Sequence, residues 1–382
     1  MSDKLGIFSF FSGAGFLDLG FEQTRKYDIL FVNEIHKPFM DIYKFSRISM
    51  GVNPPVYGHS ISDITSFLKD EKLEKLCKDV EESRKQYKYV GFIGGPPCPD
   101  FSVGGKNKGK KGENGKLSGT YANLICRAKP DFFLFENVKG LYRTQKHREF
   151  FDTLKKRFIR NGYYLTEKLI NAIEYGTPQD RERIILLGFK KSVFKGKGIS
   201  TKDSYLTDFD WNSFVKYDKN TTFEESWPEI TPYIENSTMT KPHNITQELT
   251  VEYWFNKNHV DDHYNSKRFF TPKEGLKRFR EIQEGDDKKK SYKRLHRWRY
   301  SPTAAYGNNE VHLHPYKSRR LSAAEALAIQ SLPEDYKMPN DITLSDTFKA
   351  IGNGVPFLVA EGLANNIFEF IKNQDNDTKT NR

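Results

Sequence analysis

The chain has 382 residues, a formal net charge of +11 and a hydrophobic fraction of 37%, which suffices for one large domain and a smaller one. Its three cysteines, Cys77, Cys98 and Cys126, show no CxxC spacing, so neither a disulfide framework nor a structural zinc site is indicated. No apolar run reaches the roughly 18 residues that a membrane span needs. An odd cysteine count without a signal peptide predicts a cytoplasmic protein, and the positive charge favours an acidic partner such as nucleic acid.

The first half of the chain alternates predicted strands and helices. Strands are expected at residues 5–11, 29–34, 89–94, 131–136 and 184–189, and helices at residues 15–23 and through Phe39, Ile42 and Phe45. This order predicts an α/β fold with a doubly wound, mainly parallel sheet.

The alternation stops near Lys190, and from there to about Arg299 the chain is aromatic and charged with little periodicity. Ser322 and Glu325 form a predicted capping box that starts a helix, and a further helix is expected over residues 348–371. We therefore expect a large domain from residues 1–189 and about 336–372. A smaller, irregular domain with a hinge is expected at about 190–335, and a disordered tail at 373–382.

The segment GGPPCPDFS, which contains Cys98, follows an apolar run that is predicted to be a buried strand. A stiff Pro-Pro turn thus presents Cys98 at the carboxyl end of a strand, the edge at which open α/β sheets bind ligands. Cys98 is therefore a candidate nucleophile. Cys77 and Cys126 lie in helical patterns, where cysteine is ordinarily a small apolar filler.

The residues 104–119 directly after this turn are rich in glycine and lysine. They are interpreted either as a solvated loop or as a mobile basic lid that closes over a polyanion. Their position beside Cys98 favours the lid.

A glycine-containing segment, FSGAGFLD, joins the first predicted strand to the first helix. Gly13 and Gly15 allow a ligand to approach the backbone at a helix N-terminus, and Glu34 is placed to accept hydrogen bonds from ribose hydroxyls. A dinucleotide site has a third glycine where this chain has Asp18. Because a carboxylate at the helix start repels a pyrophosphate but not a sulfonium, the loop favours S-adenosylmethionine over NAD. Asp63 is either a contact to the adenine amino group or a helix N-cap.

Four further polar segments adjoin apolar runs: FLFENV with Glu136, TPQDRER with Arg181 and Arg183, RRL before the capped helix, and IGNGVP with Asn353. With the glycine loop and the Pro-Cys turn, they resemble the motifs of the C5-cytosine DNA methyltransferase family, in order and over nearly the whole chain. The matching patterns are Phe-x-Gly-x-Gly, Pro-Cys followed by Phe-Ser, Glu-Asn-Val, Gln-x-Arg-x-Arg, Arg-x-Leu-x-x-x-Glu and Gly-Asn-x-Val-Pro. The chain departs from the family at Phe16, often a second glycine, and at Pro99, commonly glutamine. Neither departure removes a reacting group.

The resemblance implies the class I S-adenosylmethionine-dependent methyltransferase fold and a DNA (cytosine-5) methyltransferase without a metal. It implies that Cys98 attacks C6 of cytosine so that C5 takes the methyl group. Glu136 would contact N3 and the exocyclic amine, and Arg181 and Arg183 would hold the base O2 and the region around the thiolate. Because the reacting atoms are buried in a duplex, the cytosine is expected to flip out. Cofactor contacts are implied for Phe11, Gly13, Ala14, Gly15, Glu34, Ile35, Asp63, Ile64, Pro97 and Asn353.

By the same resemblance, residues 190–317 would recognise the target sequence in double-stranded DNA. Between Lys267 and Arg299, 13 Lys and Arg residues stand against 5 Asp and Glu residues, so we expect the basic stretch 288–299 to neutralise phosphates and an arginine to contact guanine. A merely solvated basic face is the alternative.

The family further implies a monomer that protects host DNA beside a cognate restriction endonuclease, without a stable complex between them. Two other interpretations remain: a tRNA cytosine-5 methyltransferase, and a DNA-binding module with degenerate chemistry. The long basic region argues against the first, and the intact motif residues argue against the second.

Overall fold

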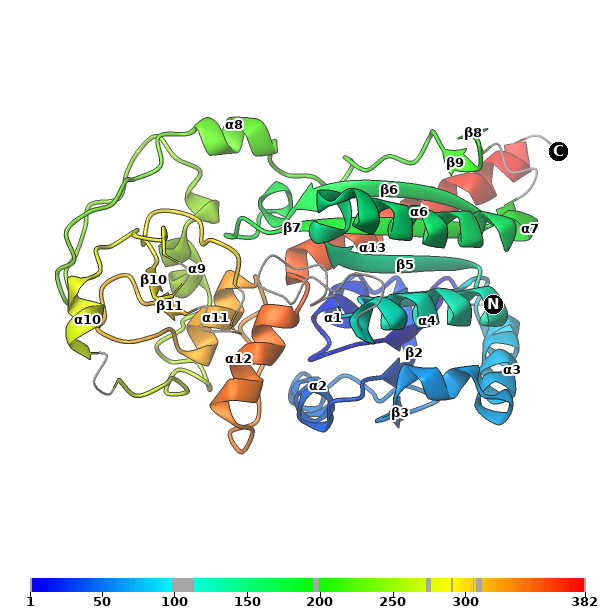
Figure 1. The fold of residues 1–382 in the computed structure, drawn as a ribbon, viewed down its shortest axis with the longest axis horizontal. Coiled ribbons are helices and arrows are strands. Elements are labelled where there is room, and N and C mark those ends of the chain that lie inside the picture. The colour runs from blue at the N-terminus through cyan, green and yellow to red at the C-terminus, as the bar shows by residue number, and fades with distance from the viewer. Residues whose placement is uncertain are drawn as a thin grey trace.

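The structure, a computed structural model, describes residues 2–97, 113–194, 199–272, 276–289, 291–304, 306 and 311–380. It has two lobes (Figure 1): a large lobe around a long twisted sheet, and a smaller lobe of short elements joined by extended chain.

In the part of the chain that the structure describes, the large lobe contains a nine-stranded sheet with the order β3-β2-β1-β4-β5-β7-β6-β9-β8. Strands β1 to β5 pair in parallel, whereas β7 runs antiparallel to both β5 and β6. The predicted α/β fold with a mainly parallel, doubly wound sheet is confirmed. The strands are β1 (Leu5–Phe10), β2 (Tyr27–Asn33), β3 (His59–Ser60), β4 (Val90–Gly94), β5 (Phe132–Val138), β6 (Tyr163–Asn171), β7 (Glu182–Lys190), β8 (Thr201–Lys202) and β9 (Tyr205–Leu206).

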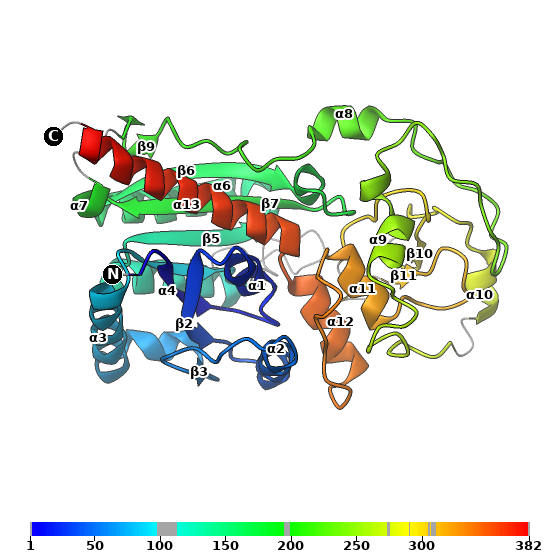
Figure 2. The same cartoon turned by 180° about the vertical axis from the view of Figure 1, so that it is seen from behind.

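Helices cover both faces of this sheet (Figures 1 and 2). Helices α1 (Phe16–Gln23), α2 (Lys37–Ser49) and α13 (Phe357–Thr380) lie on one face, and α3 (Asp70–Gln86), α4 (Glu113–Ala128) and α6 (Gln145–Arg160) lie on the other. The buried residues of β1 alternate between the two cores, with Ile7 in one and Phe8 in the other, as the two-residue period of a strand requires. Helix α13 packs on α1, so the C-terminal helix returns to the first strand, as expected from the position of Asn353. Shorter elements are η1 (Ile64–Leu68), α5 (Gly140–Arg143), η3 (Ala172–Tyr175) and α7 (Lys191–Phe194).

The smaller lobe has little regular structure and is joined to the large lobe through α11 (Ala323–Ile329) and α12 (Leu344–Asn353). One face of α11 packs through Leu327 with Phe16 and Phe39 of the large lobe. Its other face packs through Ala324 in a second cluster with Trp254 and other residues of the small lobe. The remaining elements are α8 (Lys219–Glu224), η4 (Gln247–Leu249), α9 (Val251–Lys257), α10 (Leu276–Glu281), β10 (Lys293–Arg294) and β11 (His312–Leu313).

The boundary between the domains lies further along the chain than the sequence predicted. Strands β8 and β9 extend the large sheet, and Phe209 and Trp211 pack into its core. The expected boundary at residue 189 was therefore wrong, because these short strands carry no periodicity that marks them as part of the sheet. Strand β6 was also missed, since Thr166, Glu167 and Lys168 interrupt its apolar pattern.

The C-terminal helices differ from the expectation in two respects. The single helix expected over residues 348–371 is two helices, because Gly354 has an extended backbone and Pro356 lacks an amide donor. Helix α13 continues into the tail expected to be disordered from residue 373 and ends at Thr380. Gln374 is buried, and Asp375 accepts a hydrogen bond of 2.6 Å from the Tyr89 hydroxyl.

Candidate active site

A large cleft of about 1640 Å³ lies where the sheet meets the smaller lobe. The ends of β1, β2 and β4 and the final residues of β5 contribute to its lining, as do residues that precede α13 and residues of the smaller lobe. Because β7 is antiparallel to β5, the beginning of β7 reaches the edge at which β5 ends, and Val138 pairs with Arg183. Polar groups from strands far apart in the sequence thus meet at one edge.

Glu136 and Arg183 form an ion pair in this cleft, with 2.9 Å between Oε1 of Glu136 and Nε of Arg183. Burial lowers the pKa of Arg183, while the neighbouring Glu136 carboxylate opposes that shift. Gly95 permits the arrangement, since a Cβ at this position would lie 2.6 Å from Oε2 of Glu136. The pair presents a carboxylate beside a planar cation, a combination that can contact adjacent polar atoms of one base.

The turn before Cys98 is fixed by the residue after Glu136. Asn137 is buried, and its amide nitrogen donates a hydrogen bond of 3.3 Å to the carbonyl of Pro96. Pro97 lines the cleft. Cys98 itself and residues 104–112 of the predicted lid lie outside the described residues. From Glu113 onward the expected lid is helix, because α4 begins there.

The glycine loop has the backbone that its sequence predicts. Phe11, Gly13 and Gly15 all have positive φ angles, of 54°, 56° and 80°, and such an angle in a bulky residue such as Phe11 marks local strain. A side chain at Gly15 would also collide with the Tyr43 ring at 2.5 Å. The loop therefore brings bare backbone to the cleft, where Phe11, Gly13 and Ala14 form part of the lining.

Glu34 and Asp63 lie beside this loop. The Glu34 carboxylate accepts hydrogen bonds from the amides of Gly13, at 2.9 Å, and His36, at 2.8 Å. Asp63 is the N-cap of η1, since its side chain accepts from the Thr65 amide at 2.8 Å. Asp63 also lines the cleft, with Ile64 and with Ile35, whose side chain is 59% exposed. The N-cap interpretation is thus correct, and the cap does not remove Asp63 from the cleft.

Asp18 does not act as the sequence argument assumed. It is fully buried, and its carboxylate accepts hydrogen bonds from Ser9, at 2.7 Å, and Tyr43, at 3.0 Å. Burial raises its pKa. These contacts tie α1 to β1 and α2, so the carboxylate of Asp18, a residue that also lines the cleft, stabilises the fold.

Arg181 holds the hinge between the lobes. Its guanidinium is buried and donates to the carbonyls of Ala304, Gly352 and Gly354 at 3.2, 2.9 and 3.0 Å. Burial lowers its pKa, and the neighbouring Arg183 lowers it further. Asn353, between two of these carbonyls, lines the cleft. Gln179 bonds the Ala304 amide in the same junction, a role that the sequence pattern did not reveal.

The basic stretch is only partly available to a ligand. Arg294 is buried, with its guanidinium bonded to backbone carbonyls that include those of Ile282 and Lys317. Arg297 is buried in a bidentate pair with Glu284. The expectation that both neutralise phosphates was wrong, because their charges are used within the lobe, whereas Lys288 and Lys289 are exposed.

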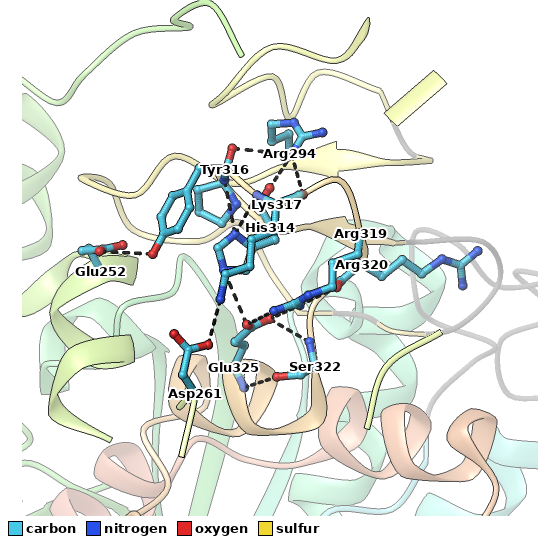
Figure 3. A network of polar contacts seen from close by, with 11 residues as sticks. Glu252, Asp261, Arg294, His314, Tyr316, Lys317, Arg319, Arg320, Ser322 and Glu325 are labelled. Atoms are coloured by element: carbon cyan, nitrogen blue, oxygen red, sulfur yellow. Dashed lines mark hydrogen bonds and ion pairs between the residues drawn. The ribbon is translucent and has the colours of Figure 1, made fainter. Parts of the chain in front are cut away.

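The Arg-x-Leu motif divides two neighbouring arginines between different tasks (Figure 3). Arg319 forms a bidentate pair with Glu325 at 2.7 and 2.8 Å, and Glu325 also completes the predicted capping box with Ser322. The Arg320 side chain extends away from this network and lines the cleft.

Among the described residues, no group of three or more His, Cys, Asp or Glu side chains is arranged to hold a metal ion. Within the same residues, no helix has the length and apolar character to cross a membrane.

Known proteins resemble the chain over nearly its whole length. A model of the C-5 cytosine-specific DNA methylase family matches residues 5–369. The chain is 57% identical over 377 residues to the type II methyltransferase M.NmeDI of Neisseria meningitidis serogroup C, covering 99% of this chain and 86% of that protein. It is 28% identical over 382 residues to M.FnuDI of Fusobacterium nucleatum, covering 97% and 96%.

Solved structures agree in fold. A putative DNA modification methyltransferase encoded in an Escherichia coli prophage has a TM-score of 0.59 at 21% identity, covering 97% of this chain and all of that chain. The Dnmt2 methyltransferase of Schizosaccharomyces pombe has a TM-score of 0.58 at 13% identity, covering 96% and 99%. From the family match and the 57% relative, the chain belongs to the C-5 cytosine-specific DNA methylase family and is a DNA methyltransferase that modifies C5 of cytosine.

Proposed function

We propose that this enzyme transfers a methyl group from S-adenosylmethionine to C5 of a cytosine flipped out of a specific double-stranded DNA sequence, with Cys98 as the nucleophile. The observation that carries the proposal is the ion pair of Glu136 and Arg183, 2.9 Å apart, in the cleft that Pro97 and the glycine loop also line. Pro97 directly precedes Cys98. The candidate base contacts, the cofactor loop and Pro97 thus share one edge of the sheet, which supports Cys98 as the nucleophile.

The sheet end of the cleft fits S-adenosylmethionine. The Glu34 carboxylate accepts two backbone hydrogen bonds and has lone pairs left for ribose hydroxyls. The exposed Ile35 side chain offers an apolar surface for adenine, and Asp63 offers an acceptor for its amino group. When bound, the cofactor supplies a methyl group on a positively charged sulfur. We assign contacts with it to Phe11, Gly13, Ala14, Gly15, Glu34, Ile35, Asp63, Ile64, Pro97 and Asn353.

The protein's own residues act mainly on the base. The Cys98 thiolate forms a bond to C6, and electron density moves to C5, which thereby becomes able to accept a methyl group. Glu136 contacts N3 and the exocyclic amine and stabilises the adduct, while Arg183 holds O2 and favours the thiolate form of Cys98. Water then takes the C5 proton, the double bond between C5 and C6 re-forms, and the bond from C6 to the Cys98 sulfur breaks, so that the thiolate is restored. We assign Arg181 to positioning, since its guanidinium donates to three carbonyls of the hinge.

The relatives named type II methyltransferases support a role in restriction-modification. We propose that the enzyme acts on double-stranded DNA as a cytoplasmic monomer and protects host DNA against a cognate endonuclease. Bisulfite sequencing of a plasmid treated with the enzyme identifies the target site and the modified cytosine. A parallel assay on tRNA should give no methylation; methylation of tRNA alone contradicts the assignment of the substrate.

Substitution of Cys98→Ser tests the chemical step. We expect it to abolish methyl transfer while the enzyme still binds its target duplex in a gel-shift assay, because the hydroxyl is a far weaker nucleophile than a thiolate. A duplex with 5-fluorocytosine at the target should trap a covalent adduct, since fluorine cannot leave as the C5 proton does. Cys126→Ala is the matched control and should remain active. Unchanged turnover of Cys98→Ser rejects the proposed nucleophile.

A further inference from the structure

The arginines of the smaller lobe fall into two groups. Arg294, Arg297 and Arg319 have guanidinium groups that bind carbonyls or carboxylates of the protein itself. Arg278 and Arg320 line the large cleft, and among the described residues neither guanidinium has a hydrogen-bond acceptor or a carboxylate partner. A guanidinium that lines a cleft and has no acceptor among the described residues is equipped to bind a ligand with its five N–H donors.

Aromatic rings fix the direction of these two free arginines. The guanidinium carbon of Arg320 lies 4.9 Å from the centre of the Phe270 ring and 5.9 Å from that of Tyr292. Arg278 lies 4.9 Å from the same Tyr292 ring. Contact with ring faces orients a guanidinium while leaving its N–H edge free. In Figure 3 the Arg320 side chain extends away from Arg319 and Glu325, and no polar contact is drawn to it.

Tyr292 itself has an unusual backbone. Its φ angle is 59°, a left-handed conformation that costs energy in a residue other than glycine. Its ring packs against Phe279, with 5.3 Å between ring centres, and β10 begins at the next residue. Several residues of this chain share such a φ angle, but Tyr292 is the one whose ring lies between two arginines that line the cleft, and strained residues cluster at ligand-binding sites.

We propose that Arg320 is a specificity-determining residue that recognises guanine within the DNA target, with Tyr292 as its positioning residue. This inference rests on the proposed function and deepens it. Guanine offers O6 and N7 as neighbouring acceptors in the major groove, and a guanidinium edge donates to both at once. Both arginines lie over aromatic rings, but Arg320 contacts two rings and is half-buried, whereas Arg278 contacts one and is exposed, so Arg320 is the better fixed for contact with a base edge. We assign Arg278 to the DNA phosphates, because a phosphate contact depends on the positive charge more than on a fixed orientation of the guanidinium.

The variants Arg320→Lys and Arg320→Gln test this assignment on the full-length enzyme. A plasmid library randomised around the wild-type site is methylated and sequenced after bisulfite treatment. Loss of a bidentate contact should lower discrimination at one G·C pair about 10- to 100-fold, with other positions unchanged. Arg320→Gln should shift the preference at that pair toward A·T, because glutamine pairs with the N6 and N7 atoms of adenine.

Arg280→Gln is the matched control on the same lobe. Arg280 is exposed, forms an ion pair with Glu235 at 3.2 Å, and is absent from the cleft lining. We expect it to keep the wild-type sequence preference. Thermal melting checks that each variant is folded.

Tyr292→Phe and Tyr292→Ala separate positioning from folding. The phenylalanine variant retains the ring and should retain selectivity, while the alanine variant should lose discrimination at the pair that Arg320→Lys affects.

The outcomes also separate this inference from the proposed function. If Arg320→Lys weakens methylation equally at every sequence, Arg320 contacts phosphate and the guanine assignment is overturned. Wild-type selectivity in folded Arg320→Lys and Arg320→Gln equally overturns it, while leaving cytosine methylation intact. Failure of the wild-type enzyme to methylate any cytosine in DNA rejects the proposed function itself.

Discussion

The two walls of the cleft are built on different principles. On the sheet wall, strand pairing sets the positions of the polar groups: Phe10 pairs with Asn33 on one side and Gly94 on the other. On the wall of the smaller lobe, β10 and β11 pair over only two residues each. There the backbone is held by side chains instead, above all by Arg294, whose guanidinium donates to carbonyls from two separate segments, one with Phe279 and Ile282 and the other with Lys317.

The two walls therefore differ in whether charged side chains are needed to satisfy the backbone. A regular sheet satisfies its own amides and carbonyls, so its edge can leave Glu136 and Arg183 for chemistry. An irregular lobe has carbonyls without ladder partners, and buried arginines supply the missing donors. Arg278 and Arg320, which have no acceptor among the described residues, are then available for the DNA contacts proposed above, because other arginines maintain the structure of the lobe.

The strongest test of this contrast is Arg297→Met. The side chains of Arg297 and Glu284 are 4% and 1% exposed, and their two hydrogen bonds each measure 2.8 Å. Removing the cation leaves a buried carboxylate unpaired, so we expect the free energy of unfolding to fall by about 3 to 5 kcal/mol. Urea denaturation followed by fluorescence measures it.

Arg280→Met supplies the surface control for that measurement. Arg280 pairs with Glu235 on the same lobe, but their side chains are 57% and 37% exposed. The expected loss is at most about 1 kcal/mol. Equal losses in the two variants contradict a scaffold of buried charges.

A second test compares Arg181→Lys with Arg183→Lys. Lysine cannot reach the three carbonyls that Arg181 binds, so we expect the free energy of unfolding of Arg181→Lys to fall by about 2 kcal/mol. Because Asn353 lies between the Gly352 and Gly354 carbonyls, the same variant should bind the cofactor roughly tenfold more weakly. Arg183→Lys should keep stability and cofactor affinity and lower kcat, since its partner is Glu136. Calorimetric titration and turnover measurements distinguish the two patterns; a lower kcat with unchanged stability in Arg181→Lys would assign it to the base instead.

The polar residues of the sheet wall could be predicted from the sequence, because the end of an apolar run marks the end of a strand. Glu34 and Glu136 follow apolar runs, and the structure brings both to the cleft. Cys98 was identified by the same logic, and its nucleophilic role stays a prediction.

The lobe wall could not be predicted in this way. In the printed sequence Arg294 and Arg297 look no different from Lys288 and Lys289, although the first two are buried and the others exposed. Their environment depends on carbonyls from distant segments, which no local pattern encodes. The hydrogen bonds of the Asp18 carboxylate could not be predicted for the same reason, because its partners Ser9 and Tyr43 lie on other elements.

The buried side chain of His296 makes the stability of the smaller lobe depend on pH. It is buried in the lobe, and its Nδ1 accepts a hydrogen bond of 3.0 Å from the Trp298 amide. The proton of the neutral ring is thus assigned to Nε2. A second proton would have to occupy Nδ1, against the amide donor. Burial, the largest cause, lowers the pKa of His296 from 6.5 to about 4.

The stability of the lobe should therefore fall as the solution becomes acidic. The unfolded chain binds a proton at His296 below pH 6.5 and the folded chain does so only near pH 4, so the loss grows between these values and then stops. At pH 5 this residue alone should cost about 2 kcal/mol relative to pH 7. His296→Asn retains an acceptor for the Trp298 amide and does not titrate, so its unfolding free energy should decline less over the same interval by that amount. Parallel pH profiles for the two proteins would show that His296 titrates normally and that this part of the lobe is open to water.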